Sequence, residues 1–308
     1  MTIDRIGTAS STQMMLSRIQ KAEIAVDTAN RQVSTGNVSD TYSGYGDKTA
    51  VMEIARSATE HADANIAAAQ QAASRLDLQD TQLSQLSSIA DQVRQTLTSG
   101  AANQDATALM NQMDGFFAQA TEILNAKDSS GYIFGGDKNQ TPPLTVSTLS
   151  DLAALPSVAS AFANGNIKTT MRIGDTQTIQ VGVLASDIGT QLMSLFQQVA
   201  QFNAGTPFSA ATTPAQQTFL ESTIQTATNA TEGINQVSAV NGISYQMTQN
   251  TMTRLQATSS VYKSFVSNIQ NVDMPTALSQ LNQDQIALQA SFQVTSTLNK
   301  LSLLNYLN

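Results

Sequence analysis

The sequence contains no cysteine, no tryptophan and a single histidine, His61. Without cysteine, disulfides, thiol catalysis and cysteine-ligated zinc are excluded, and one histidine nearly excludes histidine-dependent triads and zinc sites. Asp and Glu are thinly scattered and form no pair suited to acid–base catalysis. The glycine-rich stretches GYGDK (44–48) and FGGDK (134–138) lack the spacings of phosphate-binding and dinucleotide-binding loops, so we interpret them as structural turns. The sequence therefore predicts neither an enzyme nor a protein with a metal or cofactor.

Charged side chains are also scarce. They make up 12% of the chain, whereas ordinary globular domains carry roughly 25%. A surface so poor in charge predicts that much of it is buried against other surfaces. The net charge of −8 argues against nucleic acid as a partner, because that binding needs Lys and Arg to replace the counterions of phosphates.

Long apolar runs are missing as well. No stretch approaches the roughly 18 consecutive apolar residues of a membrane-spanning helix, so we expect no membrane insertion. The first twenty residues lack the basic segment and apolar run of a secretory signal peptide. We therefore expect no cleaved signal of that kind.

Proline is absent from the first 141 residues, and five of the six prolines lie between Pro142 and Pro214. Two helix-permissive arms therefore flank a central segment of different character. In the stretches TTMRIG (169–174) and TIQVGVL (178–184), apolar residues alternate with other residues, which is compatible with a β-hairpin around Gly174 and Asp175. Together with two short helical stretches, they predict a small α+β unit.

Apolar residues recur at alternating steps of three and four in the first arm, which is the spacing of left-handed coiled coils. This N-terminal seam consists of Met15, Ile19, Ala22, Val26, Ala29 and Val33. Further helices are predicted over residues 49–99, with Gly100 in the usual C-terminal position, over 106–126, and from about Pro214 onward. The final helix follows NVDMP (271–275), and its apolar set comprises Leu278, Leu281, Leu288, Phe292, Leu298, Leu301 and Leu304.

The two terminal arms are natural partners for each other. Residues 282–308 carry one acidic residue, Asp284, and one basic residue, Lys300, so a helix here must bury most of its circumference. Packing within the chain's own core explains the middle helices. For the terminal helices, the opposite arm and neighbouring chains must supply the area, since apolar burial stabilises by roughly 25 cal/mol per Å². We therefore predict that the N-terminal seam and the C-terminal apolar set form an assembly interface.

These patterns predict a mainly α, elongated fold. We expect paired N- and C-terminal coiled-coil helices, a helical middle bundle and a small α+β central domain. The predicted segments are the first helix and its turn (1–46), the first part of the helical bundle (47–141), the central domain (142–214), the second part of the bundle (215–270) and the last helix (271–308).

Three stretches resemble the bacterial flagellin family, which includes filament flagellins and hook-associated junction proteins. Residues 272–307, VDMPTALSQLNQDQIALQASFQVTSTLNKLSLLNYL, are similar to the last helix of the family. QVSTG (32–36) resembles the end of its first helix. GYIFGGDKNQTPPL (131–144) resembles a motif of the hook–filament junction members.

The resemblance implies a structural subunit of the flagellar axis. The terminal helices would line the inner core of a tube, the helical bundle would form an outer layer, and the central domain would lie at the surface. The subunit would be exported to the extracellular flagellum without a cleaved signal peptide. Its partners would be hook-associated proteins, flagellin, copies of itself and an export chaperone. A junction subunit is the first interpretation and a filament flagellin is the alternative, while the residues alone also allow a soluble coiled-coil signalling or adhesion module.

Overall fold

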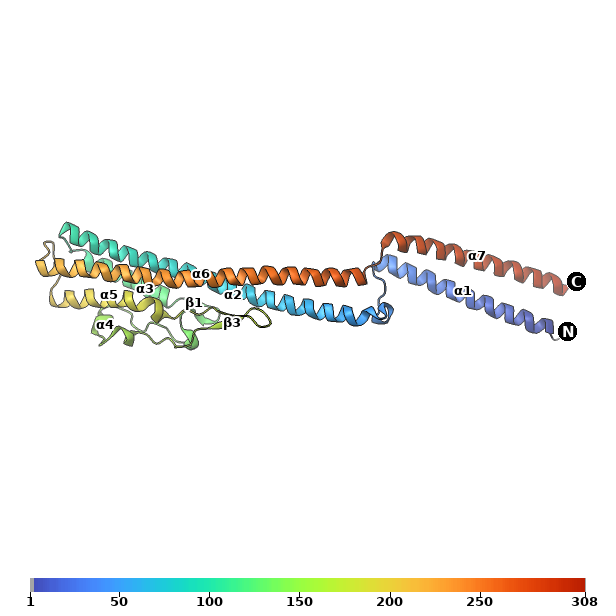
Figure 1. Ribbon diagram of the computed structural model, residues 1–308, viewed down its shortest axis with the longest axis horizontal. Helices are drawn as coiled ribbons and strands as arrows, with labels where there is room; N and C mark the ends of the chain where they lie inside the picture. Colours follow the sequence, from blue (N-terminus) through green and yellow to red (C-terminus); the bar gives the residue numbers. More distant parts are fainter. Residues whose placement is uncertain (1–2, 308) are drawn as a thin grey trace. The chain divides into compact units, whose positions relative to one another are not determined.

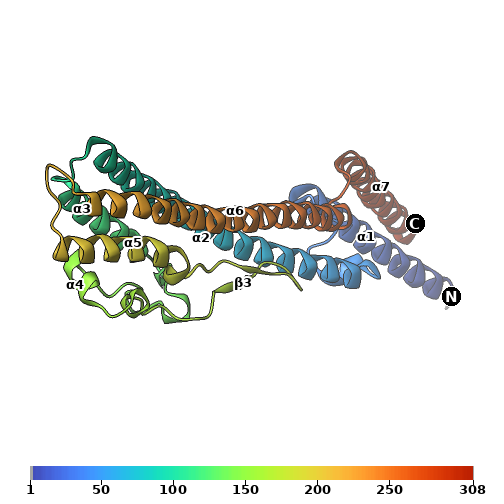
Figure 2. The ribbon, with the colours of Figure 1, turned by 60° about the vertical axis from the view of Figure 1, so that its left-hand side comes forward.

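The computed structural model describes residues 3–307 and, within them, the side chains of residues 13–297. The chain divides into two compact units, and Figures 1 and 2 show the helices that build them. Unit 1 comprises Met1–His61 and Thr258–Asn308, and unit 2 comprises Ala62–Ala257. The elements are α1 (Ile3–Thr35), α2 (Lys48–Asn103), α3 (Leu109–Leu124), β1 (Lys127–Asp128), β2 (Gly131–Tyr132), α4 (Leu149–Ala154), β3 (Thr170–Arg172), β4 (Thr178–Gln180), α5 (Ala185–Gly205), α6 (Pro214–Gln270) and α7 (Met274–Leu307).

The prediction of a mainly α fold is confirmed. The strands in the described residues form two antiparallel pairs, β1 with β2 and β3 with β4. No helix in this part of the chain is long and apolar enough to cross a membrane. The division into five segments stays a prediction, because the structure groups the same residues into two units.

The core of unit 2 is built from amphipathic helices. In α3, Leu109, Met113, Phe117, Ala120 and Leu124 are buried, and steps of three and four place them on one helical face. The rings of Phe117 and Phe196 meet edge to face, with centroids 5.7 Å apart. The same apolar cluster includes residues of the central segment such as Leu144 and Leu152, so the central segment and the helices share one core.

The predicted hairpin is present. Strand β3 pairs antiparallel with β4, and Met171 lies opposite Ile179. Ile173, Ile179 and Val181 form a small buried cluster with Ala69, Ala72 and Leu76 of α2. The side-chain amide of Gln79 donates a hydrogen bond of 2.8 Å to the carbonyl oxygen of Val181, so the hairpin is attached to α2 by apolar burial and by a polar contact.

The glycine-rich stretch FGGDK is a structural turn. Gly136 has φ +64°, and a Cβ atom there would lie 2.6 Å from Cδ2 of Leu184, so glycine is the residue that this conformation accepts. The backbone N–H of Ile167 donates to the carboxylate of Asp137 at 3.1 Å, and this bond lowers the pKa of that carboxyl. Strand β2 ends at Tyr132, because the chain turns where the N–H of Gly135 donates to the carbonyl of Tyr132.

The end of α2 differs from the prediction. The helix continues through Gly100, which is buried, and ends at Asn103. Gln104 then takes a left-handed conformation with φ 54°. The following turn is held by Asp105, whose carboxylate accepts hydrogen bonds from the N–H and the hydroxyl of Thr107, and these bonds lower its pKa. Helix α3 consequently begins at Leu109 rather than at residue 106.

Candidate assembly surface

Helices α1 and α7 of unit 1 lie side by side and run in opposite directions (Figure 1). The apolar residues of the N-terminal seam lie at the contact between the two helices. Ile19 and Ala29 are buried, and Met15, Ala22, Val26 and Val33 are half-buried. All six predicted seam residues are thus shielded, and α7 is the helix that α1 contacts. The structure therefore places the N-terminal seam inside the chain's own helix pair.

The C-terminal apolar set is divided. Leu281 and Leu288 are half-buried, whereas Leu278 and Phe292 remain 45% and 48% exposed. The side chains of Leu298, Leu301 and Leu304 lie outside the described residues. Of the predicted assembly residues with a described side chain, Leu278 and Phe292 are therefore the ones that a second molecule could contact without separating α1 from α7.

Sequence reasoning missed a second group of apolar residues in the same helix pair. Leu16 and Ile24 on α1 and Ile286 and Val294 on α7 are 51–66% exposed. The sequence does contain a signal for this second group, because the two residues on each helix lie eight positions apart, which is about two helical turns. The prediction considered a single apolar stripe on each helix and therefore did not include them. Full burial of a Leu, Ile or Val side chain stabilises by about 1.5–3 kcal/mol, so covering these residues would add to any assembly.

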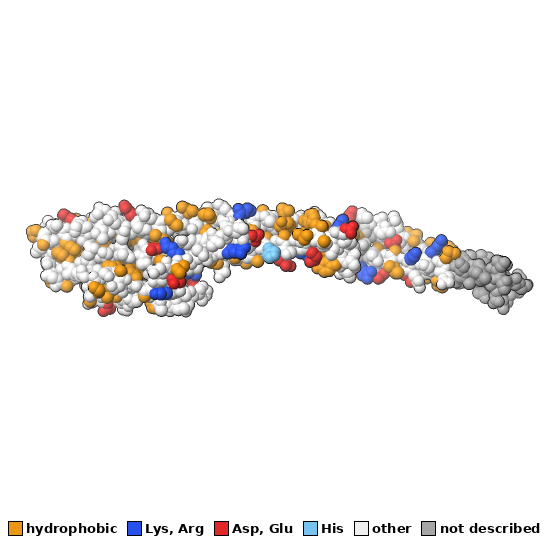
Figure 3. Space-filling view, turned by 60° about the horizontal axis from the view of Figure 1, so that its bottom comes forward, with side chains coloured by type: hydrophobic (Ala, Val, Ile, Leu, Met, Phe, Trp, Pro, Cys, Tyr) orange, Lys and Arg blue, Asp and Glu red, His pale blue; other side chains and the backbone are white. Residues whose placement is uncertain are grey.

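Charge is distributed unevenly over this helix pair. The described part of α7 carries one charged side chain, Asp284. The described part of α1 carries five, namely Arg18, Lys21, Glu23, Asp27 and Arg31, of which Asp27 and Arg31 form an exposed ion pair of 3.6 Å. Figure 3 shows charged side chains among uncharged polar and apolar ones on one face of the molecule. The surface of α7 can therefore be dehydrated at a lower cost than that of α1.

The ends of α1 and α7 are joined by backbone pairing. Gly36 takes φ +73° and ends α1, as QVSTG predicted. The N–H of Val38 donates to the carbonyl of Gln270 at 2.8 Å, and the N–H of Val272 donates to the carbonyl of Gly36 at 2.9 Å. These two bonds hold the start of α7 beside the end of α1.

Arg56 adds side-chain contacts to this joint. Its guanidinium donates to the Tyr42 hydroxyl at 2.8 Å and to Oε1 of Gln270 at 3.0 Å, and it lies 3.8 Å from the Glu53 carboxylate. Sequence reasoning gave no role to Arg56 or Tyr42, because the partners lie up to 214 positions apart. The connection between the ends of α1 and α7 therefore depends on contacts between residues far apart in the sequence, which helical periodicity does not predict.

The described residues that could bind a metal ion do not form a cluster. His61 is exposed on α2. Among the residues that the structure describes, no group of three His, Asp or Glu side chains is placed to hold a metal ion. The feature that α1 and α7 do present is a set of exposed apolar side chains, including Leu278 and Phe292.

Residues 224–307 match the family described as the bacterial flagellin C-terminal helical region. No curated protein matches this sequence significantly. The matched region contains most of α6 and the whole of α7.

Two solved structures share the fold. A flagellar hook-associated protein from Vibrio parahaemolyticus aligns with a TM-score of 0.61 and 12% identity, over 75% of this chain and 99% of that protein. FlgL of Bacillus cereus aligns with a TM-score of 0.55 and 14% identity, over 70% of this chain and 98% of that protein. The resemblance to the flagellin family is therefore confirmed, by sequence in the C-terminal region and by fold over most of the chain.

Proposed function

We propose that this chain, with its flagellin-type C-terminal region, is a structural subunit of the bacterial flagellar axis and acts at the junction between hook and filament. The observation that carries the proposal is the α1–α7 pair. The pair buries its N-terminal seam, yet it leaves Leu278 and Phe292 exposed on α7, whose described part carries a single charged side chain. Such a helix pair suits repeated lateral contacts with copies of itself and with neighbouring axial proteins.

The remaining features support a structural role. The match of the C-terminal region to a flagellin family favours a structural subunit over an enzyme. The subunit would be exported, without a cleaved signal peptide, to the extracellular flagellum. An export chaperone would cover the apolar terminal helices until assembly, because exposed apolar faces favour aggregation.

The decisive test is a charge placed in the C-terminal apolar set. Leu288→Asp should abolish incorporation into flagella, because a half-buried carboxylate without a partner is costly in a packed helix interface. The thermal unfolding of unit 2 should stay unchanged, since Leu288 lies in unit 1. Gln246→Asp, which adds the same charge at an exposed position of α6 in unit 2, is the matched control and should assemble normally. Normal incorporation of Leu288→Asp would refute the proposal.

The flagellin match favours one alternative, a filament-forming subunit. Purified flagellin should grow long filaments on added seeds, whereas a junction subunit should not elongate alone. Electron microscopy after seeding distinguishes the two. Limited proteolysis of the free monomer addresses the coiled-coil signalling or adhesion module, which would keep its terminal helices resistant to cleavage.

A further inference from the structure

We propose that a hollow in unit 2, between α2, α6 and the segment that follows β4, is a hydration site. Ordered water there donates hydrogen bonds to Oε1 of Gln79 and to Oδ1 of Asn241. The hollow has a volume of about 270 Å³, and both residues line it. Gln79 lies on α2 and Asn241 on α6. The site is independent of the proposed function, because all of its residues belong to unit 2.

The orientation of the two side chains is fixed by the NH₂ half of each carboxamide. Gln79 is fully buried, and its NH₂ group donates to the carbonyl oxygen of Val181 at 2.8 Å. Asn241 is 4% exposed, and its NH₂ group donates to the carbonyl oxygen of Leu76 at 2.8 Å. A carbonyl oxygen can only accept a hydrogen bond, so neither carboxamide can be turned the other way round. Each side-chain oxygen must therefore find a donor elsewhere.

Neither oxygen has a hydrogen-bond partner within the part of the chain that the structure describes. In that part, Nε of Arg75 is the other buried side-chain atom without a partner, and Arg75 does not line the hollow. Such atoms are rare in folded proteins, because burial removes their hydrogen bonds to water without a replacement. Two acceptors from separate helices that line one hollow therefore point to a donor that is not part of the chain.

The lining of the hollow identifies this donor as a neutral molecule. An anion has no donor to offer to the two oxygens. A cation would lie near the ammonium group of Lys168, which also lines the hollow, and like charges repel each other. The ion pair of 2.8 Å between Lys168 and Asp187 holds that ammonium group in place. A neutral group with O–H or N–H donors is the chemistry that fits.

Water is the neutral donor with free access to this site. Lys168 and Val240 line the hollow and are exposed, so the hollow opens to solvent. Folded proteins hold about one buried water per 27 residues, and such waters bond to polar groups that otherwise lack a partner. The hydroxyl of Ser244 lines the same hollow and can act as a further donor or acceptor. Together with the two oxygens, it supplies the polar surroundings that a buried water needs.

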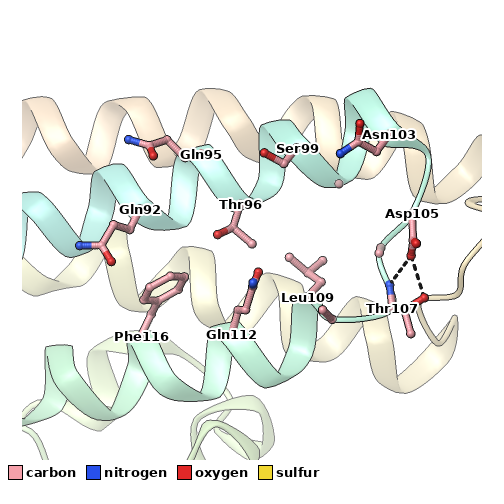
Figure 4. Close-up of a pocket in the computed structure, with 13 residues that line it drawn as sticks. Gln92, Gln95, Thr96, Ser99, Asn103, Asp105, Thr107, Leu109, Gln112 and Phe116 are labelled. Atoms are coloured by element: carbon pink, nitrogen blue, oxygen red, sulfur yellow. Dashed lines mark hydrogen bonds between the residues drawn. The ribbon is translucent and has the colours of Figure 1, made fainter.

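The hollow between α2 and α3 provides a contrast (Figure 4). Gln92 and Gln95 of α2 line it, and both residues are exposed. Exposed carboxamides exchange hydrogen bonds with bulk solvent and require no ordered partner. Ordered water is therefore expected at the buried pair of Gln79 and Asn241 and not at these exposed residues.

The test is an NMR measurement of magnetisation transfer from water to side-chain NH₂ protons in the full-length, deuterated protein. Long-lived bound water gives nuclear and rotating-frame Overhauser effects of opposite sign, whereas proton exchange gives signals of the same sign in both experiments. We expect effects of opposite sign at the NH₂ groups of Gln79 and Asn241.

Gln216 is the matched control within unit 2. It is 1% exposed, and both halves of its carboxamide are bonded inside the protein. Its NH₂ group donates to the carbonyl oxygen of Pro207 at 2.8 Å, and its Oε1 accepts from the N–H of Thr213 at 2.8 Å. Gln216 should therefore show no Overhauser effect from water.

Two variants make the assignment specific. Asn241→Leu should reduce the effects at Gln79 at least about twofold, because water in the hollow loses one of its acceptors. Gln236→Leu, at an exposed position of the same lining, should leave them unchanged. The double variant Ser244→Ala/Lys168→Met removes the lining hydroxyl and ammonium protons, which exchange with water and could relay its magnetisation. That variant should keep the effects at Gln79 and Asn241.

Three outcomes would overturn the proposal. The first is the absence of Overhauser effects from water at Gln79 and Asn241. The second is an equally strong effect at Gln216. The third is loss of the effects in Ser244→Ala/Lys168→Met, which would assign them to exchanging protons of the protein. None of these measurements involves assembly, so failure here is distinct from failure of the proposed function.

Discussion

The two units of the chain bury their apolar residues in different ways. Unit 2 encloses large side chains such as Phe117, Phe134 and Phe196 completely. In the described part of unit 1, the buried apolar residues are Ile19, Ala29, Met52, Ala55 and Ala277. Large apolar side chains such as Phe265 and Phe292 stay exposed there. Unit 2 has a core of its own. Two paired helices such as α1 and α7 cannot surround an apolar side chain on all sides, so they form no such core.

This difference separates folding from assembly. Removing apolar surface from water supplies most of the driving force for folding, and unit 2 buries its large apolar side chains within the chain. Unit 1 leaves some of its apolar side chains exposed, so their burial remains possible on contact with another molecule. Substitutions in the two units should therefore affect different measurements.

The largest effect is expected for Phe117→Ala. Deletion of this fully buried ring, which packs edge to face on Phe196, should lower the free energy of unfolding of unit 2 by about 3–5 kcal/mol. Urea denaturation followed by circular dichroism measures the loss. Phe292→Ala makes the same chemical change at an exposed site and should cost less than about 0.5 kcal/mol in that assay, while weakening assembly. Equal losses in both variants would contradict the contrast between the units.

An intermediate effect is expected at the turn of unit 2. Gly136→Ala should destabilise unit 2 by about 1–3 kcal/mol, because a non-glycine residue is strained at positive φ and the added Cβ would press on Leu184. Gly115→Ala is the matched control, since no atom lies within 4 Å of a Cβ there and the site is inside α3. That control should stabilise by about 0.5–1 kcal/mol. Thermal unfolding of both variants shows whether the signs are opposite.

The smallest effect concerns pH. The hydrogen bond from Ile167 N–H lowers the pKa of Asp137 in the folded state. A carboxyl with a lowered folded pKa contributes stability that is complete above its unfolded pKa of about 3.9 and is lost as the pH falls through the folded pKa. Asp137→Asn should therefore be less stable than wild type at neutral pH, and the gap should narrow in acid. A gap that stays constant from neutral to acidic pH would show that the ionised carboxylate contributes nothing.

Much of the fold follows from local patterns. The mainly α class, the hairpin around Gly174 and the start of α6 at Pro214 were all predictable, because periodicity and turn residues act over a few positions. The end of α2 was not, since the sequence signal pointed to Gly100 and the chain turns at Gln104. There, the loops around residues 105 and 209 bond to each other, with Ala106 N–H donating to the Ser209 carbonyl. Contacts between distant segments overrode the local signal.

By itself, the sequence determined which residues are apolar, where most helices form and how little charge the C-terminal arm carries. Periodicity and composition are properties of neighbouring residues, so they can be read without a structure. Only the tertiary structure decided that the N-terminal seam is covered by α7 and that Phe292 is left exposed. The physical reason is that burial and pairing depend on which segments meet, and these segments are separated by tens to hundreds of residues.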